Sequence, residues 1–281
     1  MRKIALTSDN HFDVNKLDAT AIRAQQVDYL LANDYDDYLI AGDLFNDFQE
    51  SLLFVEKMAA EMAGKCRVFF IAGNHDMVRG VTFAELQSDL SPNYVHQKTV
   101  TFPGTNYVLI GNNGWYDYSF ADQEIGESQV TFEKWKRAYW IDGVIEQPIS
   151  DPERMQLVLN QTHQNLEKAR QQRKQVLYMT HFVPRRDYIS YQATSRIWRM
   201  ANAVMGSRHL GALLEAYQVE TVLFGHTHTK FQPRQFGQTT YLCKPVGYGL
   251  KRLNEWKSSS NFMGEWRACL QTKYLAMATR K

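Results

Sequence analysis

The chain has 281 residues, and its 32 basic and 30 acidic residues leave a formal net charge of +2. Hydrophobic residues make up 44% and charged residues 22%, which predicts a packed core in one large domain or two small ones. The balanced charge disfavours nucleic acid as a partner, and no apolar run is long enough to span a membrane.

The three cysteines, Cys66, Cys243 and Cys269, are odd in number and widely spaced. This pattern disfavours a disulfide framework and favours buried free thiols in a reducing compartment. Near the N-terminus, only Ile4-Ala5-Leu6 separate basic residues from polar ones, and such a run is too short for the core of a signal peptide. We therefore expect a cytoplasmic protein.

Strand-like and helix-like segments alternate in the first part of the chain. Apolar runs of β formers occupy three segments, residues 3–7, 38–41 and 68–72. Between them, helical spacing of apolar residues covers residues 15–33 and 49–63, and Gly64 is typical of a helix stop. This alternation predicts a parallel sheet with right-handed crossovers.

The rest of the chain is predicted to combine regular elements with two insertions. The regular elements are a short helix at 82–90, a hairpin of strands 99–102 and 107–110, helices at 151–172 and 207–217, and strands at 176–180, 221–224, 239–243 and near 266–277. We interpret the aromatic-rich residues 112–150 as an insertion over the carboxyl ends of the strands, and the irregular residues 182–206 as a second one. The aromatic side chains would either pack a satellite core or form one wall of a substrate pocket. Since no linker or repeat interrupts the chain, we expect a single domain spanning residues 1–281.

Five of the apolar runs end in Asp, Asn or His. The polar residues that follow them form the blocks Ser8-Asp9-Asn10-His11, Gly42-Asp43, Gly73-Asn74-His75-Asp76, His181, and Gly225-His226-Thr227-His228. Ligands bind at the carboxyl ends of strands in open α/β sheets. Asp, Asn and neutral His suit borderline divalent metals such as Mn, Fe, Zn, Co or Ni, and burying them together without metal would leave their charge poorly satisfied. The pattern therefore predicts a metal site.

These blocks, with Leu44-Phe45-Asn46 after Asp43, occur in the order of the calcineurin-like metallophosphoesterase superfamily, which the chain resembles. The resemblance implies an α/β fold, a two-sheet β-sandwich flanked by helices, with a binuclear metal centre. It implies that one ion is bound by Asp9, His11, Asp43 and His228. The second ion would be bound by Asn74, His181 and His226, with Asp43 as the bridge.

The implied activity is hydrolysis of phosphoric esters, with a small phosphate ester as the substrate. A carboxylate bridge can hold two ions about 3.5–4 Å apart, and a water shared by them would lose a proton and attack phosphorus in line. His75 follows a ligand directly and would donate a proton to the leaving oxygen or stabilise the phosphoryl group as a cation. Arg185 and Arg186 are candidates for binding an anionic part of the substrate, with solvated loop charges as the alternative.

Two positions depart from the pattern of the phosphatase branch. Asn46 stands where an Asp usually orients the catalytic His, so Asp47 or Asp76 could take that role instead. Phe48 replaces the Arg that usually follows in protein phosphatases, which disfavours that specificity. Phosphodiesterase and phosphomonoesterase both stay open. A nuclease of the same superfamily is disfavoured by the short chain and balanced charge. A non-catalytic metal-binding module and a purely structural metal are further alternatives.

Overall fold

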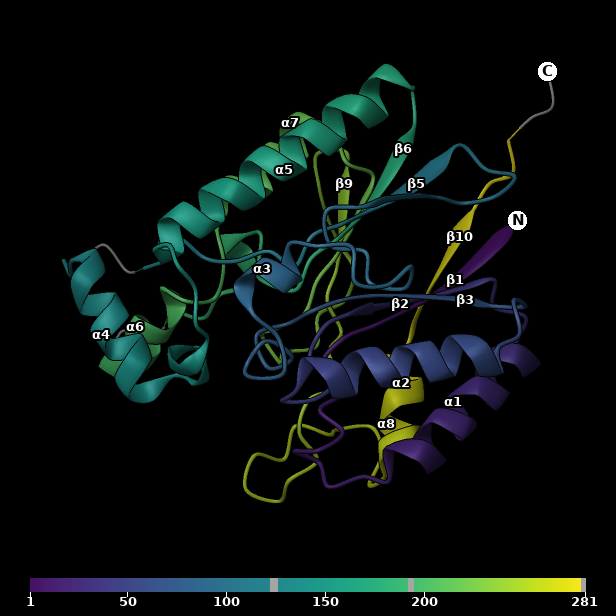
Figure 1. Cartoon of the computed structure of the whole chain (residues 1–281), viewed down its shortest axis with the longest axis horizontal. Helices are drawn as coiled ribbons and strands as arrows, with labels where there is room; N and C mark the ends of the chain where they lie inside the picture. Colours follow the sequence, from purple (N-terminus) through teal and green to yellow (C-terminus); the bar gives the residue numbers. More distant parts are fainter. Residues whose placement is uncertain (122–125, 192–194, 279–281) are drawn as a thin grey trace.

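The computed structural model describes residues 1–121, 126–191 and 195–278. Two β-sheets stack face to face, and helices cover the outer side of each sheet (Figure 1). This arrangement confirms the predicted fold class, an α/β two-sheet sandwich flanked by helices. In the described part of the chain, no helix is both long enough and apolar enough to cross a membrane.

The first sheet has four strands in the order β10-β1-β2-β3. Its strands are β1 (Arg2–Thr7), β2 (Asp37–Ala41), β3 (Arg67–Ile71) and β10 (Gln271–Leu275). The first three are parallel, as the strand–helix alternation predicted, and β10 runs antiparallel to β1. The outer face of this first sheet is covered by α1 (Ala19–Ala32), α2 (Phe48–Glu61) and α8 (Phe262–Cys269) (Figure 1).

The second sheet has six strands in the order β4-β5-β6-β7-β9-β8. They are β4 (Thr99–Thr101), β5 (Tyr107–Gly111), β6 (Gln175–Met179), β7 (Thr221–Leu223), β8 (Arg234–Phe236) and β9 (Thr239–Leu242). The central four are parallel, whereas β4 and β8 pair antiparallel at the two edges. The long helix α5 (Asp151–Gln171) and the shorter α7 (Arg208–Ala216) cover this sheet.

Both faces of the central strands are buried, which explains why they are continuous apolar runs in the sequence. Alternate residues such as Leu39 and Leu177 face the layer between the two sheets. Their neighbours Tyr38 and Tyr178 face the helices instead. Since side chains alternate along a strand, each strand joins the inner core to an outer one, and the strand ends are held rigidly.

Residues 112–150 contain α4 (Gln129–Tyr139) and the short 3-10 helix η2 (Ile141–Val144), and residues 122–125 lie outside the described ranges. The insertion lies at the same end of the molecule as the loops that follow β1, β2 and β3 (Figure 1). Trp115 and Tyr116 are fully buried and stack on each other with ring centroids 4.5 Å apart. These two aromatic residues therefore pack into the same core as the helix-facing sides of the sheets, and not into a separate satellite core as one of the two alternatives expected.

Three sequence predictions need correction. Residues 182–206, expected to be irregular, contain η3 (Arg186–Tyr188) and α6 (Arg196–Asn202), while 192–194 lie outside the described ranges. The strand expected near 266–277 is correct only for β10, because Phe262, Met263, Trp266 and Cys269 form the buried face of α8 at helical spacing. The short helix expected at 82–90 is limited to α3 (Phe83–Leu86).

Candidate metal centre

The loops at the carboxyl ends of five strands meet at one place between the two sheets. The first sheet contributes the residues after β1, β2 and β3, and the second contributes those after β6 and β7. The structure brings together all seven side chains predicted as metal ligands, which are Asp9, His11, Asp43, Asn74, His181, His226 and His228. All of them except the partly exposed His228 are buried.

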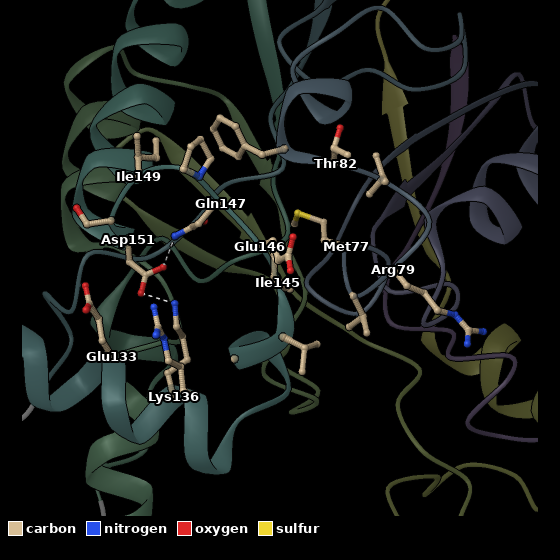
Figure 2. Close-up of a pocket in the computed structure, with 18 of the residues that line it drawn as sticks. Met77, Arg79, Thr82, Glu133, Lys136, Ile145, Glu146, Gln147, Ile149 and Asp151 are labelled. Carbon is tan, nitrogen blue, oxygen red and sulfur yellow. Dashed lines mark hydrogen bonds and ion pairs between the residues drawn. The ribbon is translucent and has the colours of Figure 1, made fainter.

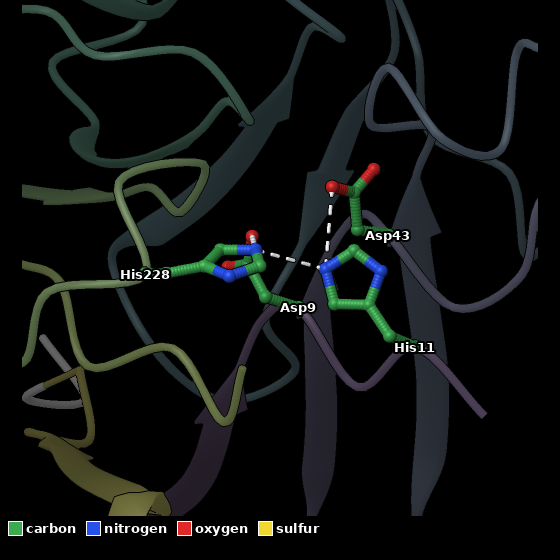
Figure 3. Close-up of side chains that lie close together, drawn as sticks. All are labelled: Asp9, His11, Asp43 and His228. Atoms are coloured by element: carbon green, nitrogen blue, oxygen red, sulfur yellow. Dashed lines mark hydrogen bonds and ion pairs between the residues drawn. The ribbon is translucent and has the colours of Figure 1, made fainter. Parts of the chain in front are cut away.

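The first group consists of Asp9, His11, Asp43 and His228, whose potential ligand atoms lie within 4.8 Å of one another (Figure 3). The Nε2 atoms of His11 and His228 face each other at 2.9 Å. His11 Nε2 lies 3.6 Å from Asp43 Oδ2, and His228 Nε2 lies 3.5 Å from Asp9 Oδ1. Two imidazole nitrogens and two carboxylate oxygens are thus close enough together to bind one ion.

The second group consists of Asp43, His181 and His226, with Asn74 beside them. His181 Nε2 lies 3.3 Å from Asp43 Oδ2 and 3.1 Å from Asn74 Oδ1. Asn74 Oδ1 also lies 3.0 Å from His226 Nδ1. Asp43 Oδ2 therefore faces both groups, which is the arrangement that a bridging carboxylate needs.

The side chains of the cluster are better suited to binding divalent cations than to hydrogen bonding with one another. Among the described residues, Oδ2 of the buried Asp9 has no hydrogen-bond partner, which is costly for a carboxylate unless a cation is close. Two carboxylates, one amide oxygen and four imidazoles are suitable ligands for borderline metals such as Mn, Fe, Zn, Co or Ni. The residues present therefore fit a pair of divalent ions.

The backbone is strained where it presents these side chains. Asp9, His11, Asp43, His226 and His228 all have positive φ values, between 46° and 69°, although none is glycine. Non-glycine residues seldom adopt this left-handed region, and such strain is concentrated at functional sites.

Two glycines let the loops approach each other closely. A Cβ at Gly42, which has φ +85°, would lie 2.8 Å from His181 Nδ1, and a Cβ at Gly73 would collide with Asp43 Oδ1. Any side chain at either position would therefore displace a group of the cluster.

Three acceptors outside the cluster orient the rings and the amide. The carbonyl oxygen of Ala41 accepts from His181 Nδ1 at 2.8 Å, which turns Nε2 of that ring into the cluster. Glu255 Oε2 lies 2.8 Å from His228 Nδ1. Asp142 Oδ1 accepts from Asn74 Nδ2 at 2.8 Å, so Asn74 Oδ1 points at the histidines. Sequence reasoning missed Asp142 and Glu255 because neither lies in a motif.

His75 is held between two neighbours and is not part of either ligand group. Its Nδ1 lies 2.6 Å from Asn46 Oδ1, which can only accept, and its Nε2 lies 3.2 Å from the hydroxyl of Tyr248. Asp47 instead caps α2 and pairs with Arg79 at 3.0 Å. Asn46 therefore orients His75 in this structure.

Asp76 holds two loops of the site together. Its carboxylate accepts from the backbone N–H groups of Asp43, Leu44 and Gly73 at 2.7 to 3.0 Å, and from the Ser51 hydroxyl at 2.5 Å. These bonds tie the loop after β2 to the loop after β3, so Asp76 supports the site without facing His75.

The charges of the cluster move the histidine pKa values in opposite directions. Burial lowers the pKa of His226 to about 3 and the pKa of His75 below its usual value. Although burial opposes the change, Asp43 raises the pKa of His181 to about 9. For His228, hydrogen bonds with Asp9 and Glu255 outweigh burial and raise the pKa to about 10. The rings of His181 and His228 are therefore protonated when no metal is bound, and a metal ion that binds them would replace these protons.

The two arginines proposed for substrate binding lie on the second insertion. Arg185 pairs with Asp187 at 2.8 Å and with Glu215 of α7, and its guanidinium lies 3.7 Å from the centre of the Phe236 ring. Arg186 is exposed and lies over the Tyr191 ring at 4.3 Å. Because Arg185 already has two carboxylate partners, Arg186 is the better candidate of the two, and its role stays a prediction.

A groove with a volume of about 1170 Å³ separates the segment after His75 from the first insertion (Figure 2). Residues between 77 and 84 line one side, and residues between 133 and 151 line the other. Among the described residues, the lining includes none of the seven ligand positions, and its link to them is through Gly143, which follows Asp142, the partner of Asn74. Lys136 and Gln147 both donate to Asp151 and so are occupied within the protein.

The sequence matches the family model described as calcineurin-like phosphoesterase over residues 2–230. The chain therefore belongs to the calcineurin-like phosphoesterase family. Curated protein sequences gave no match. Among solved structures, phosphopantetheinyl hydrolase from Mycobacterium tuberculosis has a similar fold, with a TM-score of 0.65 and 16% identity over 97% of this chain and 95% of that one. A dimetal phosphatase from Danio rerio has a TM-score of 0.51 and 13% identity over 87% of each chain.

Proposed function

We propose that this protein is a binuclear metal-dependent hydrolase of phosphoric esters. The observation that carries the proposal is that Asp43 belongs to both candidate ligand groups. One ion would be bound by Asp9, His11, Asp43 and His228, and the other by Asp43, Asn74, His181 and His226. Membership of the phosphoesterase family supports the substrate class.

Bound divalent ions would supply an acidified water as the nucleophile and would neutralise charge on the phosphoryl oxygens. The chain itself supplies the geometry and a proton donor. His75 is the donor, because its Nδ1 is held by Asn46 while its Nε2 points away from that contact toward Tyr248. Because burial lowers the pKa of His75 and its Nδ1–H faces Asn46, Nε2 must first take up a proton, which the negative charge of a bound phosphoric ester would favour. The cationic ring would then protonate the leaving oxygen from Nε2 or stabilise the phosphoryl group. An Asn partner supports the cationic ring less strongly than a carboxylate would.

The substrate we propose is a small phosphoric ester, either a diester or a monoester. The groove lined by Met77 and Gly143 has room for the organic part of such a molecule. The formal net charge of +2 favours a small substrate over a long polyanion. Each of the seven ligand positions has a side chain that can bind metal, and His75 can transfer a proton. This favours an enzyme over a non-catalytic binding module.

The test is a substrate screen on protein supplied with Mn²⁺, Fe²⁺, Zn²⁺, Co²⁺ or Ni²⁺. The panel contains aryl monoesters, aryl diesters and pyrophosphate, and also a phosphopantetheinyl ester, because a hydrolase of that name shares the fold. We expect metal-dependent hydrolysis of at least one ester, and its loss in Asp43→Asn. Hydrolysis that persists in Asp43→Asn would point to a contaminant, and inactivity on every ester with two ions bound would contradict the proposal.

A further inference from the structure

The segment of residues 244–257, which follows β9, crosses the candidate metal centre and carries Tyr248. It lies beyond residue 230, where the match to the family model ends. The Tyr248 ring is half-buried, with its centre 4.6 Å from that of His11 and 4.5 Å from that of His228. Its hydroxyl oxygen lies 3.2 Å from His75 Nε2, the atom that faces the substrate in the proposed function.

Tyr248 is held in place by hydrogen bonds on both sides. Its backbone N–H donates to Glu255 Oε2 at 2.6 Å, and the same oxygen lies 2.8 Å from His228 Nδ1. The N–H of Gly247 donates to the carbonyl oxygen of Asp9 at 2.9 Å, and the N–H of Gly249 donates to Asn15 Oδ1 at 2.8 Å. The hydroxyl is thus positioned by the same groups that position the cluster.

The left-handed backbone at Gly247 makes this anchoring possible. Gly247 has φ +76°, and a Cβ there would lie 2.6 Å from Glu255 Oε2, which is the oxygen that accepts from Tyr248. Only glycine has both the conformation and the space at this position. A donor held this rigidly loses little energy to reorganisation when charge develops beside it.

The position of the hydroxyl allows it to share one substrate atom with His75. Two groups 3.2 Å apart can both reach a single oxygen atom at about 2.8 Å, which is an ordinary hydrogen-bond distance. We propose that Tyr248 is a catalytic residue, whose O–H donates a hydrogen bond to the same ester oxygen that His75 Nε2 contacts. This inference rests on the proposed phosphoesterase function. In the absence of substrate, the two groups bond to each other, and an ester oxygen replaces that contact.

The test compares Tyr248→Phe with a control, Tyr274→Phe, which removes a hydroxyl from an exposed tyrosine on β10. Both variants keep the aromatic ring, so the packing of residue 248 on His11 and His228 is unchanged. For Tyr248→Phe we expect kcat to fall by roughly 10²-fold or more, as for loss of one preorganised donor, with two ions still bound. KM should change little, because the bond strengthens as charge develops in the transition state. Tyr274→Phe should behave as the parent.

A double variant shows whether the two groups act on one atom. Because both would contact the same oxygen, Tyr248→Phe in a His75→Ala background should reduce kcat by much less than it does in the parent. In a series of aryl esters, the decrease in kcat caused by Tyr248→Phe and that caused by His75→Ala should depend in the same way on the pKa of the leaving group.

Three results would overturn this role for Tyr248. Parental kcat in Tyr248→Phe would mean that the ring is only a wall of the site. Loss of bound metal in that variant would mean a supporting role, and fully additive losses in the double variant would mean two separate oxygens. Inactivity of the parent itself toward every ester, with two ions bound, would contradict the proposed function as well, and so is distinguishable from failure of the Tyr248 role alone.

Discussion

Asp43 Oδ2 lies 3.3 Å from His181 Nε2 and 3.6 Å from His11 Nε2, so one carboxylate oxygen faces both halves of the cluster. If this oxygen bridges two ions, Asp43→Asn removes a negative charge from both sites at once. We expect the variant to lose tight binding of both ions, measured by elemental analysis and by metal titration. Retention of one ion at parental affinity would show that Asp43 serves only a single site.

His75 follows Asn74 and packs its ring against His11, with the ring centroids 4.6 Å apart, but it belongs to neither ligand group. Its removal should therefore separate catalysis from metal binding. We expect His75→Ala to lower kcat by roughly 10²–10⁴-fold, the usual effect of removing a general acid or base, with metal content near that of the parent. An activated leaving group such as a nitrophenolate should mask part of the loss, since it needs less protonation. Loss of metal from this variant would instead identify His75 as a ligand.

At the level of single residues, the sequence identified the motif side chains that the fold brings together, but not the groups that contact them from other segments. Asp9, Asn74 and His181 are recognisable because each follows an apolar strand directly, and parallel strands bring their carboxyl ends to one edge. Asp142, Tyr248 and Glu255 contact the cluster only because two distant segments fold back over it. No local pattern encodes such a contact, since it depends on how the whole chain packs.

Each ligand group has one carboxyl side chain that contacts a ligand from outside the group, and the two come from different elements. Changing each of them in turn gives a matched pair of variants. Asp142 in η2 contacts Asn74, whereas Glu255 in the segment after β9 contacts His228. Groups that orient a metal ligand typically contribute 10- to 100-fold to affinity. We therefore expect Asp142→Asn to weaken one ion and Glu255→Gln to weaken the other, each by about that factor.

Titration with Mn²⁺ of the parent and both variants would measure this effect, and each variant is the control for the other. The parent should bind two ions in two steps, and a different step should shift in each variant. If both variants weaken the same step, or if neither changes affinity, the assignment of these carboxylates to separate ions is wrong.

At the level of elements, the buried strands and the long helices were the most predictable. Strands β1, β2 and β3 follow from their apolar runs, and α1 begins after Asp18, which accepts from the N–H groups of Thr20 and Ala21. The secondary-structure predictions were wrong where the pattern of apolar residues was short or fitted both a helix and a strand. The strand expected near 266–277 included Trp266 and Cys269, which are instead on the buried face of α8, a short helix that packs beside α1.

The protein as a whole should bind metal in a pH-dependent manner. With no ion bound, the surrounding carboxylates hold the pKa of His181 at about 9 and that of His228 at about 10, so both rings are protonated at pH 7. An ion that binds must displace these protons, and its affinity should therefore rise with pH until the rings lose their protons unaided. The expected slope is about tenfold per pH unit for each displaced proton.

Calorimetric titration with Mn²⁺ between pH 6 and pH 8, in buffers of different ionisation enthalpy, would measure both the affinity and the number of protons released. We expect tighter binding and net proton release throughout this range. An affinity that stays constant or falls as the pH rises would show that the two histidines are neutral before metal binds, or that they are not ligands.

The sandwich brings loops from both sheets to one place, where we propose that they enclose two ions bridged by Asp43. The most direct measurement is a crystal structure of the Mn²⁺-loaded protein with anomalous scattering data collected near the manganese absorption edge. We predict two anomalous peaks about 3.5–4 Å apart, with Asp43 contacting both, His11 and His228 on one side, and His181 and His226 on the other. A single peak at full occupancy, or two peaks that do not share Asp43, would show that Asp43 does not bridge a pair of ions.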